Sequence, residues 1–314
     1  MPTPDRGHPA ETPPLDPLEL WPLLHRRLNR LSASSAELPT QLHGIYQDLA
    51  QVLATHPDDS LFVLAQMLQD PHHGYSATHA LLAATTCLLI APSAGIAGAP
   101  LDALIQAALT MNIAMRQLQD QLVLQSQPLD VEQRLAIEQH PLDGAALLRK
   151  VGVMDMTWLS LVADHHETPD GQGYPRGKLV KDPLQHLLRM SDLFIARISP
   201  RRTRRGLAPN IALRNLYLEM RDHSGELSAL FAKQMGMYPP GSYVQLNSGE
   251  LAVVMRRGER VNCPLAIAIT DPLGAPLSLP LVRDTQTPAF AVKRSVYHEE
   301  VRVRVELARL RERL

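Results

Sequence analysis

The sequence predicts a mainly α-helical protein that carries a small antiparallel β appendage near its C-terminal end. Apolar residues recur every three or four positions over most of residues 18–230, which is typical of amphipathic helices. Over residues 235–290 the pattern changes to alternating apolar residues and closely spaced turn dipeptides, which favours short strands. Helical spacing returns over residues 296–314, so we expect a C-terminal helix there.

Composition excludes several classes of function. The 314 residues are enough to bury a large core, and their formal net charge is −1. Proteins that grip nucleic acid polymers need a basic surface, so this charge balance argues against such a partner. Two cysteines are too few for a disulfide framework, and the sequence opens without an apolar targeting segment, which together predict a cytoplasmic location.

The first 70 residues divide into a tail and a helical region. Residues 1–17 contain six prolines among polar residues and are predicted to form a disordered tail. Apolar residues at helical spacing then predict amphipathic helices over residues 18–70, with Pro39 and Pro57 as the points where one helix ends and another begins.

Residues 71–230 are expected to form one helical domain. Its candidate helices span 76–91, 101–118, 131–139, 142–150, 156–167, 183–198 and 210–221. The most apolar run, 80–91, ends at Pro92 after about 12 residues, whereas a helix that crosses a membrane needs about 20. We therefore expect a buried core helix and no membrane insertion.

Histidines and one aspartate stand out within this domain. The stretch HHETPDGQGYP starts with His165 and His166 at the end of a predicted helix. Successive helical side chains point about 100° apart, so this pair shares one ion only where the helix ends. Otherwise the pair serves two neighbouring ions, or one histidine binds an ion and the other supports a ligand of that ion. His79 and His140 stand near the starts of predicted helices, and Asp192 lies in an otherwise apolar one. A lone buried histidine is more often a hydrogen-bonded core residue, so the adjacent pair carries the metal hypothesis.

The same stretch resembles the HHExxDGxGYP signature of HD-GYP proteins, a branch of the HD metal-dependent phosphohydrolases that includes cyclic di-GMP phosphodiesterases. The matching positions are His165, His166, Glu167, Asp170, Gly171, Gly173, Tyr174 and Pro175. The resemblance implies an HD-domain helical bundle and a divalent metal bound by His79, His140, His165, His166 and Asp192. It further implies that the substrate contacts the loop residues Asp170, Gly171, Gly173, Tyr174 and Pro175.

Other segments extend this resemblance over roughly residues 70–225. GYSATHALLAA contains the tyrosine and histidine of the family's first ligand helix, here Tyr75 and His79. EQHPLDGAALL is similar to its EHPxxGaxLL element, and MSDLFIARIS to its late-aspartate helix. YPPGSYVQLNSGELAVV is similar to an appendage that many of these proteins carry after the helical domain.

The chain departs from the family at the motif that names it. Where the family has AALLHDIGK, this sequence has AALTMNIAM, so Met111 and Asn112 replace the His-Asp dyad and Met115 replaces the lysine. In the family that aspartate bridges two metal ions, and that lysine contacts the phosphate under attack. Two divalent ions about 3.7 Å apart repel by roughly 18 kcal/mol at an effective dielectric of about 20, and bridging anions offset this repulsion. We therefore expect fewer ions than in active relatives, one Fe or Mn ion or none, and very weak or absent hydrolysis.

An arginine-rich run, SPRRTRRG, lies between two predicted helices. Guanidinium groups suit phosphate oxygens, and the family carries arginine-containing segments at a similar position near the phosphate path. Arg201 and Arg202 are therefore candidate substrate-binding residues, with a solvated surface run as the alternative.

Three functions are compatible with the sequence. The first is a degenerate HD-GYP-type protein of cyclic di-GMP signalling, which keeps a partial metal pocket and binds a nucleotide or a signalling partner with little or no hydrolysis. The second is an active metal-dependent cyclic di-GMP phosphodiesterase. The third is a structural adaptor whose residues 18–70 dock a partner. Metal content separates them, because two or more ions per chain favour the enzyme, one ion with dinucleotide binding favours the sensor, and none favours the adaptor.

Overall fold

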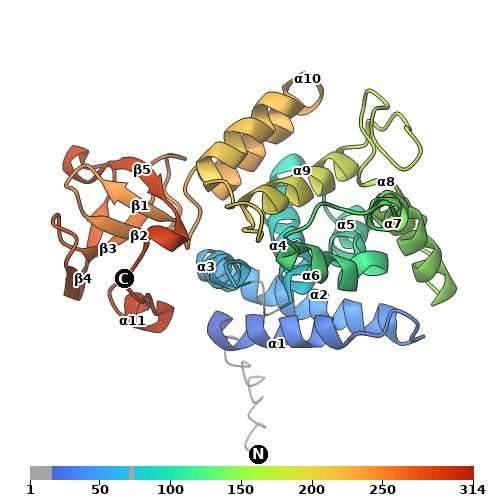
Figure 1. The fold of residues 1–314 in the computed structure, drawn as a ribbon, viewed down its shortest axis with the longest axis horizontal. Helices are drawn as coiled ribbons and strands as arrows, with labels where there is room; N and C mark the ends of the chain where they lie inside the picture. Colours follow the sequence, from blue (N-terminus) through green and yellow to red (C-terminus); the bar gives the residue numbers. More distant parts are fainter. Residues whose placement is uncertain (1–15, 71–73) are drawn as a thin grey trace, which may run out of the picture.

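A helical body and a small sheet beside it make up the protein (Figure 1). The structure is a computed structural model that describes residues 16–70 and 74–314. The mainly α fold with a C-terminal antiparallel appendage is therefore confirmed. The predicted tail, residues 1–17, lies almost entirely outside the described residues, and its last residue, Pro17, already opens the first helix.

Three helices precede the predicted helical domain: α1 (Pro17–Arg30), α2 (Leu38–Thr55) and α3 (Pro57–Leu68). Proline stands in the first turn of each, where its missing N–H costs no hydrogen bond and its fixed φ suits the helix. Asp16 caps α1 by accepting a hydrogen bond from the Leu18 backbone N–H. Their apolar faces join the main core, so this region packs on the helical body as one structure with it.

The helical body is arranged around α4 (Tyr75–Ile90), which is almost entirely buried. In Figure 1, α4 lies among the other helices of the body. These are α5 (Ala99–Thr110), α6 (Arg116–Leu124), α7 (Val131–Lys150), α8 (Met156–Asp164), α9 (Pro183–Ile198) and α10 (Pro209–Met235), with short 3-10 turns η2 (Ala91–Ala94) and η3 (Ile113–Met115). Within the described residues, one segment, Tyr75–Ala94, is long and apolar enough to cross a membrane, and 72% of that window is buried inside the fold.

Three helix predictions were wrong, and one of them is the helix expected over 210–221, which runs on to Met235 as α10. The helix expected over 101–118 breaks after Thr110, where residues 111–115 turn into η3 before α6 begins. The separate helices expected over 131–139 and 142–150 are instead one helix, α7, which runs through Pro141. A proline inside a helix removes one backbone hydrogen bond, and the side chain of His140 supplies a replacement, as described below.

The sheet has five antiparallel strands in the order β4-β3-β2-β1-β5. They are β1 (Tyr243–Leu246), β2 (Leu251–Arg256), β3 (Leu265–Thr270), β4 (Pro276–Asp284) and β5 (Val292–Val296). Two ion pairs tie the sheet to α3, because Arg256 contacts Asp59 and Arg257 contacts Asp58. The appendage is thereby fixed against the helical body.

The helix predicted over 296–314 was also largely wrong. Val296 ends β5, a 3-10 turn η5 (His298–Glu300) follows, and only α11 (Leu307–Arg311) is α-helical. The intervening VRVRV alternates apolar and charged residues, so its valines turn toward the core and its arginines outward. This period of two belongs to extended chain, and it decides the conformation there.

Candidate metal centre

The five predicted metal ligands converge from four parts of the helical body. His79 comes from α4, His140 from α7, His165 and His166 from the end of α8, and Asp192 from α9. The Nε2 atom of His79 lies 2.8 Å from Oδ1 of Asp192, and Nδ1 of His166 lies 4.0 Å from Oδ2 of the same carboxylate. Asp192 therefore connects His79 to the adjacent histidine pair.

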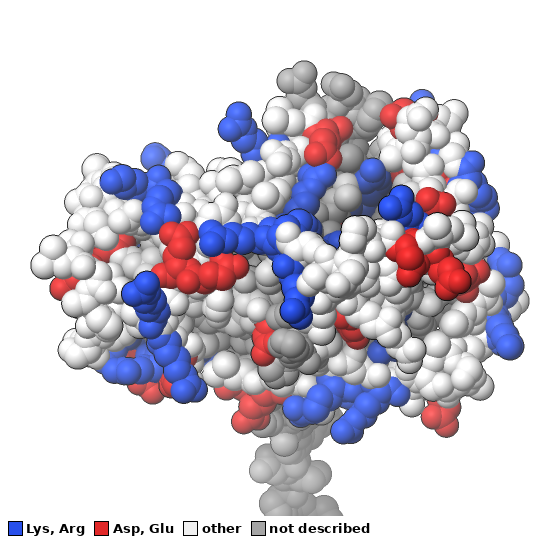
Figure 2. All heavy atoms as spheres, in the orientation of Figure 1, with Lys and Arg blue, Asp and Glu red and all other residues white. Residues whose placement is uncertain are grey.

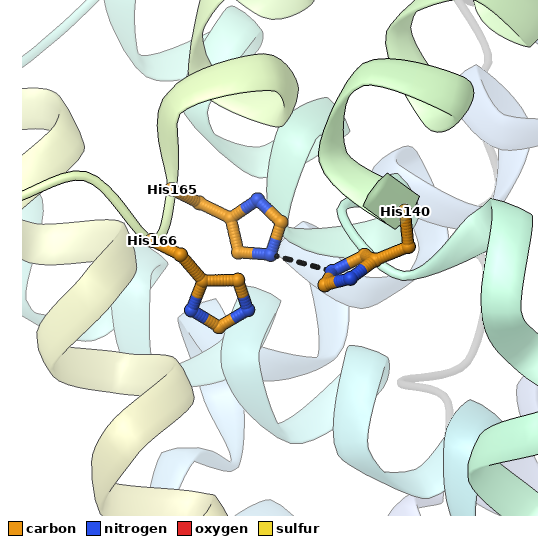
Figure 3. A group of neighbouring side chains, drawn as sticks. All are labelled: His140, His165 and His166. Carbon is orange, nitrogen blue, oxygen red and sulfur yellow. Dashed lines mark hydrogen bonds between the residues drawn. The ribbon is translucent and has the colours of Figure 1, made fainter. Parts of the chain in front are cut away.

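Three of these imidazoles form a compact cluster, shown in Figure 3. One ring nitrogen from each of His140, His165 and His166 lies within 4.8 Å of the other two. The Nε2 atoms of His140 and His165 are only 3.1 Å apart (dashed line in Figure 3). Three nitrogen donors at this spacing can hold a single ion between them.

A backbone carbonyl fixes the orientation of His140. Pro141 has no N–H, so the carbonyl of Ile137, four residues before it, lacks its usual helical donor. The Nδ1 atom of His140 lies 2.6 Å from that oxygen and donates to it. The proline that follows the histidine thus creates the acceptor that directs Nε2 of His140 into the cluster.

The end of α8 orients His165 in the same way. The last carbonyls of a helix have no intrahelical donor, and Nδ1 of His165 donates to the carbonyl of Val162 at 2.8 Å. Because carbonyl oxygens only accept, the Nδ1 atoms of both His140 and His165 carry the proton. Each Nε2 atom then carries a lone pair, and the two lone pairs face one another across 3.1 Å. This arrangement needs a cation or an added proton between the two nitrogen atoms.

The lowered pKa values of the histidines disfavour an added proton between these two Nε2 atoms at neutral pH. Burial, together with the neighbouring His165, lowers the pKa of His140 to about 3. Burial also lowers the pKa of His165 and of His166, the latter strongly. Burial alone would raise the pKa of Asp192, but the hydrogen bond from His79 and the surrounding imidazoles lower it, so this carboxylate is ionised. Neutral imidazoles beside one carboxylate favour a divalent ion.

Metal-free protein should lose stability as the pH falls below 6.5. A histidine whose pKa is depressed in the folded state takes up its proton only on unfolding, so its stabilising contribution is complete above about pH 6.5 and declines toward the folded pKa. At pH 5.5 we expect a loss of about 1.4 kcal/mol for each histidine of the cluster that stays neutral. Urea denaturation of chelator-treated protein at pH 7.5 and pH 5.5 measures this; equal free energies of unfolding would contradict it.

Met111, Asn112 and Met115 lie on the segment that joins α5 to α6. Met111 follows the last residue of α5 and is buried, and a Cβ placed on Gly144 of α7 would meet Val162, Ile113 and the Met111 carbonyl. The 111–113 segment is therefore packed against the helices that carry His140 and His165. Asn112 lines a small cavity beside α1, and its buried Oδ1 has no hydrogen-bond partner among the described residues. Met115, farther along the segment, is half-buried.

Glu167 anchors the loop that follows the histidine pair. Its fully buried carboxylate accepts hydrogen bonds from the backbone N–H groups of Arg176 and Lys178, each at 2.8 Å. The side chains of Arg176 and Lys178 both bind Asp164, the last residue of α8. These two basic residues therefore hold the loop to the helix.

The loop folds back over His166. A Cβ on Gly173 would lie 2.4 Å from the His166 carbonyl oxygen, so only glycine permits this approach. The next residue, Tyr174, stacks on the His166 ring with centroids 4.4 Å apart, and burial raises its pKa. Among the predicted substrate-binding residues, Tyr174 thus lies directly against the cluster.

The other loop candidates shape the turn. Asp170 accepts hydrogen bonds from the Thr168 hydroxyl and the Gln172 backbone, and Gly171 adopts a positive φ of 73°. Pro175 follows Tyr174 and is half-buried. These residues set the path of the loop, which in turn positions Tyr174 over His166.

The two candidate arginines differ in their surroundings. The Arg201 guanidinium acts on the Tyr75 phenol, and that phenol lies 3.1 Å from Nδ1 of His79. Both arginines are exposed, and the backbone N–H of Arg202 donates to the Val123 carbonyl of α6. Of the two, Arg201 is the one whose charge acts on a residue beside His79. Figure 2 shows Lys and Arg side chains gathered across the middle of this face, in the region where α9 ends.

Comparisons with known proteins agree with this architecture. No protein-family model matches the chain. The cyclic di-GMP phosphodiesterase PA4108 of Pseudomonas aeruginosa is 32% identical over 128 residues, which are 40% of this chain and 30% of that protein. Over this stretch the chain is similar in sequence to a cyclic di-GMP phosphodiesterase, which supports the resemblance to HD-GYP proteins. The solved structure of Bd1817, an HDG"Y"P protein from Bdellovibrio bacteriovorus, superposes with a TM-score of 0.53 over 70% of this chain and 73% of that one, at 17% identity.

The HD-GYP-type helical body thus has the fold that the sequence predicts. The matched stretch spans under a third of PA4108, and the likeness to Bd1817 concerns the fold alone.

Proposed function

We propose that this chain is a degenerate HD-GYP-type protein of cyclic di-GMP signalling, which holds one metal ion and binds the dinucleotide with little or no hydrolysis. The observation that carries the single ion is the pair of facing Nε2 lone pairs of His140 and His165, 3.1 Å apart with both Nδ1 atoms bound to carbonyls. His166 and Asp192 complete the donor set that would hold the ion.

The absence of a bridging anion supports weak hydrolysis. A close pair of dications needs shared negative charge, and the position of the bridging aspartate holds Asn112, which is neutral. The preceding Met111 offers a thioether, which is a poor ligand for Fe, Mn or Mg. Asn112 also lines a cavity on the α1 side, beside Leu28 and Arg116. A second ion would thus lack its ligands. Met115 stands where the family has the lysine that contacts the phosphate.

The cyclic di-GMP ligand is supported by the likeness to PA4108, which is itself a cyclic di-GMP phosphodiesterase. The surface beside the cluster fits a phosphate-bearing ligand with bases, because Tyr174 offers an aromatic face and Arg201 lies near Tyr75 and His79. Guanine rings stack on such faces, and guanidinium groups bind phosphate oxygens.

A binding measurement and a hydrolysis assay on the same sample test this proposal. Titration calorimetry of the metal-loaded protein with cyclic di-GMP should show binding, whereas chromatography of the mixture should show no product above the rate of a metal-free sample. The control is the double variant His165→Ala and His166→Ala. Turnover by the unmodified protein that this variant abolishes would overturn the proposal and favour the active phosphodiesterase. If the unmodified protein binds neither an ion nor the dinucleotide, the adaptor is favoured.

A further inference from the structure

Arg189 is a cation with unpaired donors beside the imidazole cluster. It lies on α9 one turn before Asp192, so the two side chains share one side of the helix. Its Nε and Nη1 atoms are buried, and neither has a hydrogen-bond partner in the described part of the chain. In the sequence it stands out as a single arginine within the mostly apolar run LLRMSDLF.

The charged neighbours of Arg189 do not neutralise it. Its charge acts on Tyr174, His166 and Asp192, so the guanidinium lies beside the imidazole cluster. The Asp192 carboxylate is already engaged, because Oδ1 binds His79 at 2.8 Å and Oδ2 lies 4.0 Å from His166. Nearby Glu219 binds Nη2 of Arg197 at 2.5 Å. The carboxylates of Asp192 and Glu219 are thus both engaged by other groups, so the Arg189 guanidinium has no counter-ion in contact among the described residues.

Arg197 has a similar surplus. It lies two turns farther along α9, its charge acts on Arg189, and its Nη1 atom is buried without a partner. A guanidinium does not lose its proton in a protein, so burial does not relieve the unpaired donors. Each buried donor left without a partner costs about 1–3 kcal/mol. The fold therefore keeps three such nitrogen atoms on one helix, next to a cluster built for a charged ligand.

We propose that Arg189 binds a phosphate oxygen of the nucleotide at the metal centre, with Arg197 as a second cation along the same helix. This rests on the proposed function for the identity of the ligand, and on the buried unpaired donors for the phosphate. A guanidinium fork suits the oxygens of a phosphate, and its charge substitutes for part of the positive charge that a second ion would supply. Arg189 would then serve as a binding residue in place of the missing lysine.

The test uses two variants of the full chain and two probes, pyrophosphate and cyclic di-GMP, in titration calorimetry. Arg189→Met keeps most of the length and removes the charge, and we expect it to weaken binding of both probes by about 10–100-fold. Arg189→Lys keeps the charge without the guanidinium fork, so its affinity for both probes should lie between those of Arg189→Met and of the unmodified protein. The matched control is Arg26→Met, an exposed arginine on α1, which should bind both probes as the unmodified protein does.

Thermal unfolding without ligand separates binding from a structural role. Removing a buried, unpaired charge should leave the melting temperature of Arg189→Met unchanged or higher, whereas a structural arginine would lower it. Unchanged affinity for both probes in Arg189→Met overturns the inference, as does loss of affinity that accompanies a lower melting temperature. Pyrophosphate binding that depends on Arg189, without any cyclic di-GMP binding, would support the anion site and overturn only the proposed ligand.

Discussion

Replacing His165 and His166 together by Ala is expected to abolish metal binding. The cluster offers three nitrogen donors, and this change leaves His140 alone among them. Structural metal sites with four ligands bind with roughly 10–16 kcal/mol, so the loss of two ligands should lower the affinity by about 10⁴-fold. Elemental analysis of protein purified without added metal measures the result, with about one ion per unmodified chain and none per variant chain.

A matched variant guards this result against a general effect of losing histidines. His43 and His298 are both exposed and belong to other parts of the fold, so His43→Ala and His298→Ala together should keep the ion. An ion retained by the His165 and His166 variant would contradict the assignment. Two adjacent anomalous-scattering peaks in the unmodified protein would contradict the single-ion site.

Replacing Glu167 by Ala should destabilise the protein by about 3–6 kcal/mol. Its buried carboxylate accepts two backbone hydrogen bonds at 2.8 Å, from Arg176 and Lys178, and hydrogen bonds to a charged group contribute about 1.5–3 kcal/mol each. Without them the loop is no longer drawn back toward α8, so the stacking of Tyr174 on His166 should also be lost. Urea denaturation measures the free energy of unfolding.

A second variant tests whether the charge and the two acceptors matter. Glu167→Gln keeps the volume but turns an amide donor toward one of the two backbone N–H groups, so about half of the loss is expected. Glu259→Ala, at an exposed position of the sheet appendage, is the matched control and should change the free energy by less than about 0.5 kcal/mol. If Glu167→Ala behaves like Glu259→Ala, the anchoring role is wrong.

The sequence predictions were most accurate where local residues mark both ends of a helix. The long helix α4 was predicted almost to the residue, because its apolar run and the flanking Gly74 and Pro92 are local signals. The helix over 296–314 failed because VRVRV alternates with a period of two, which places its valines on the core side of an extended chain. At Pro141 the rule that a proline ends a helix failed, because the His140 side chain donates the hydrogen bond that the proline cannot donate.

Residue identity alone indicated the resemblance to HD-GYP proteins and the departure at Met111, Asn112 and Met115, because a signature of adjacent residues can be recognised without any tertiary contact. Only the tertiary structure decided the geometry of the centre, because its contacts join residues far apart in the chain. His140 meets His165 across 25 residues, and His79 meets Asp192 across 113. The unpaired donors of Arg189 likewise emerge only once folding has removed water from around them.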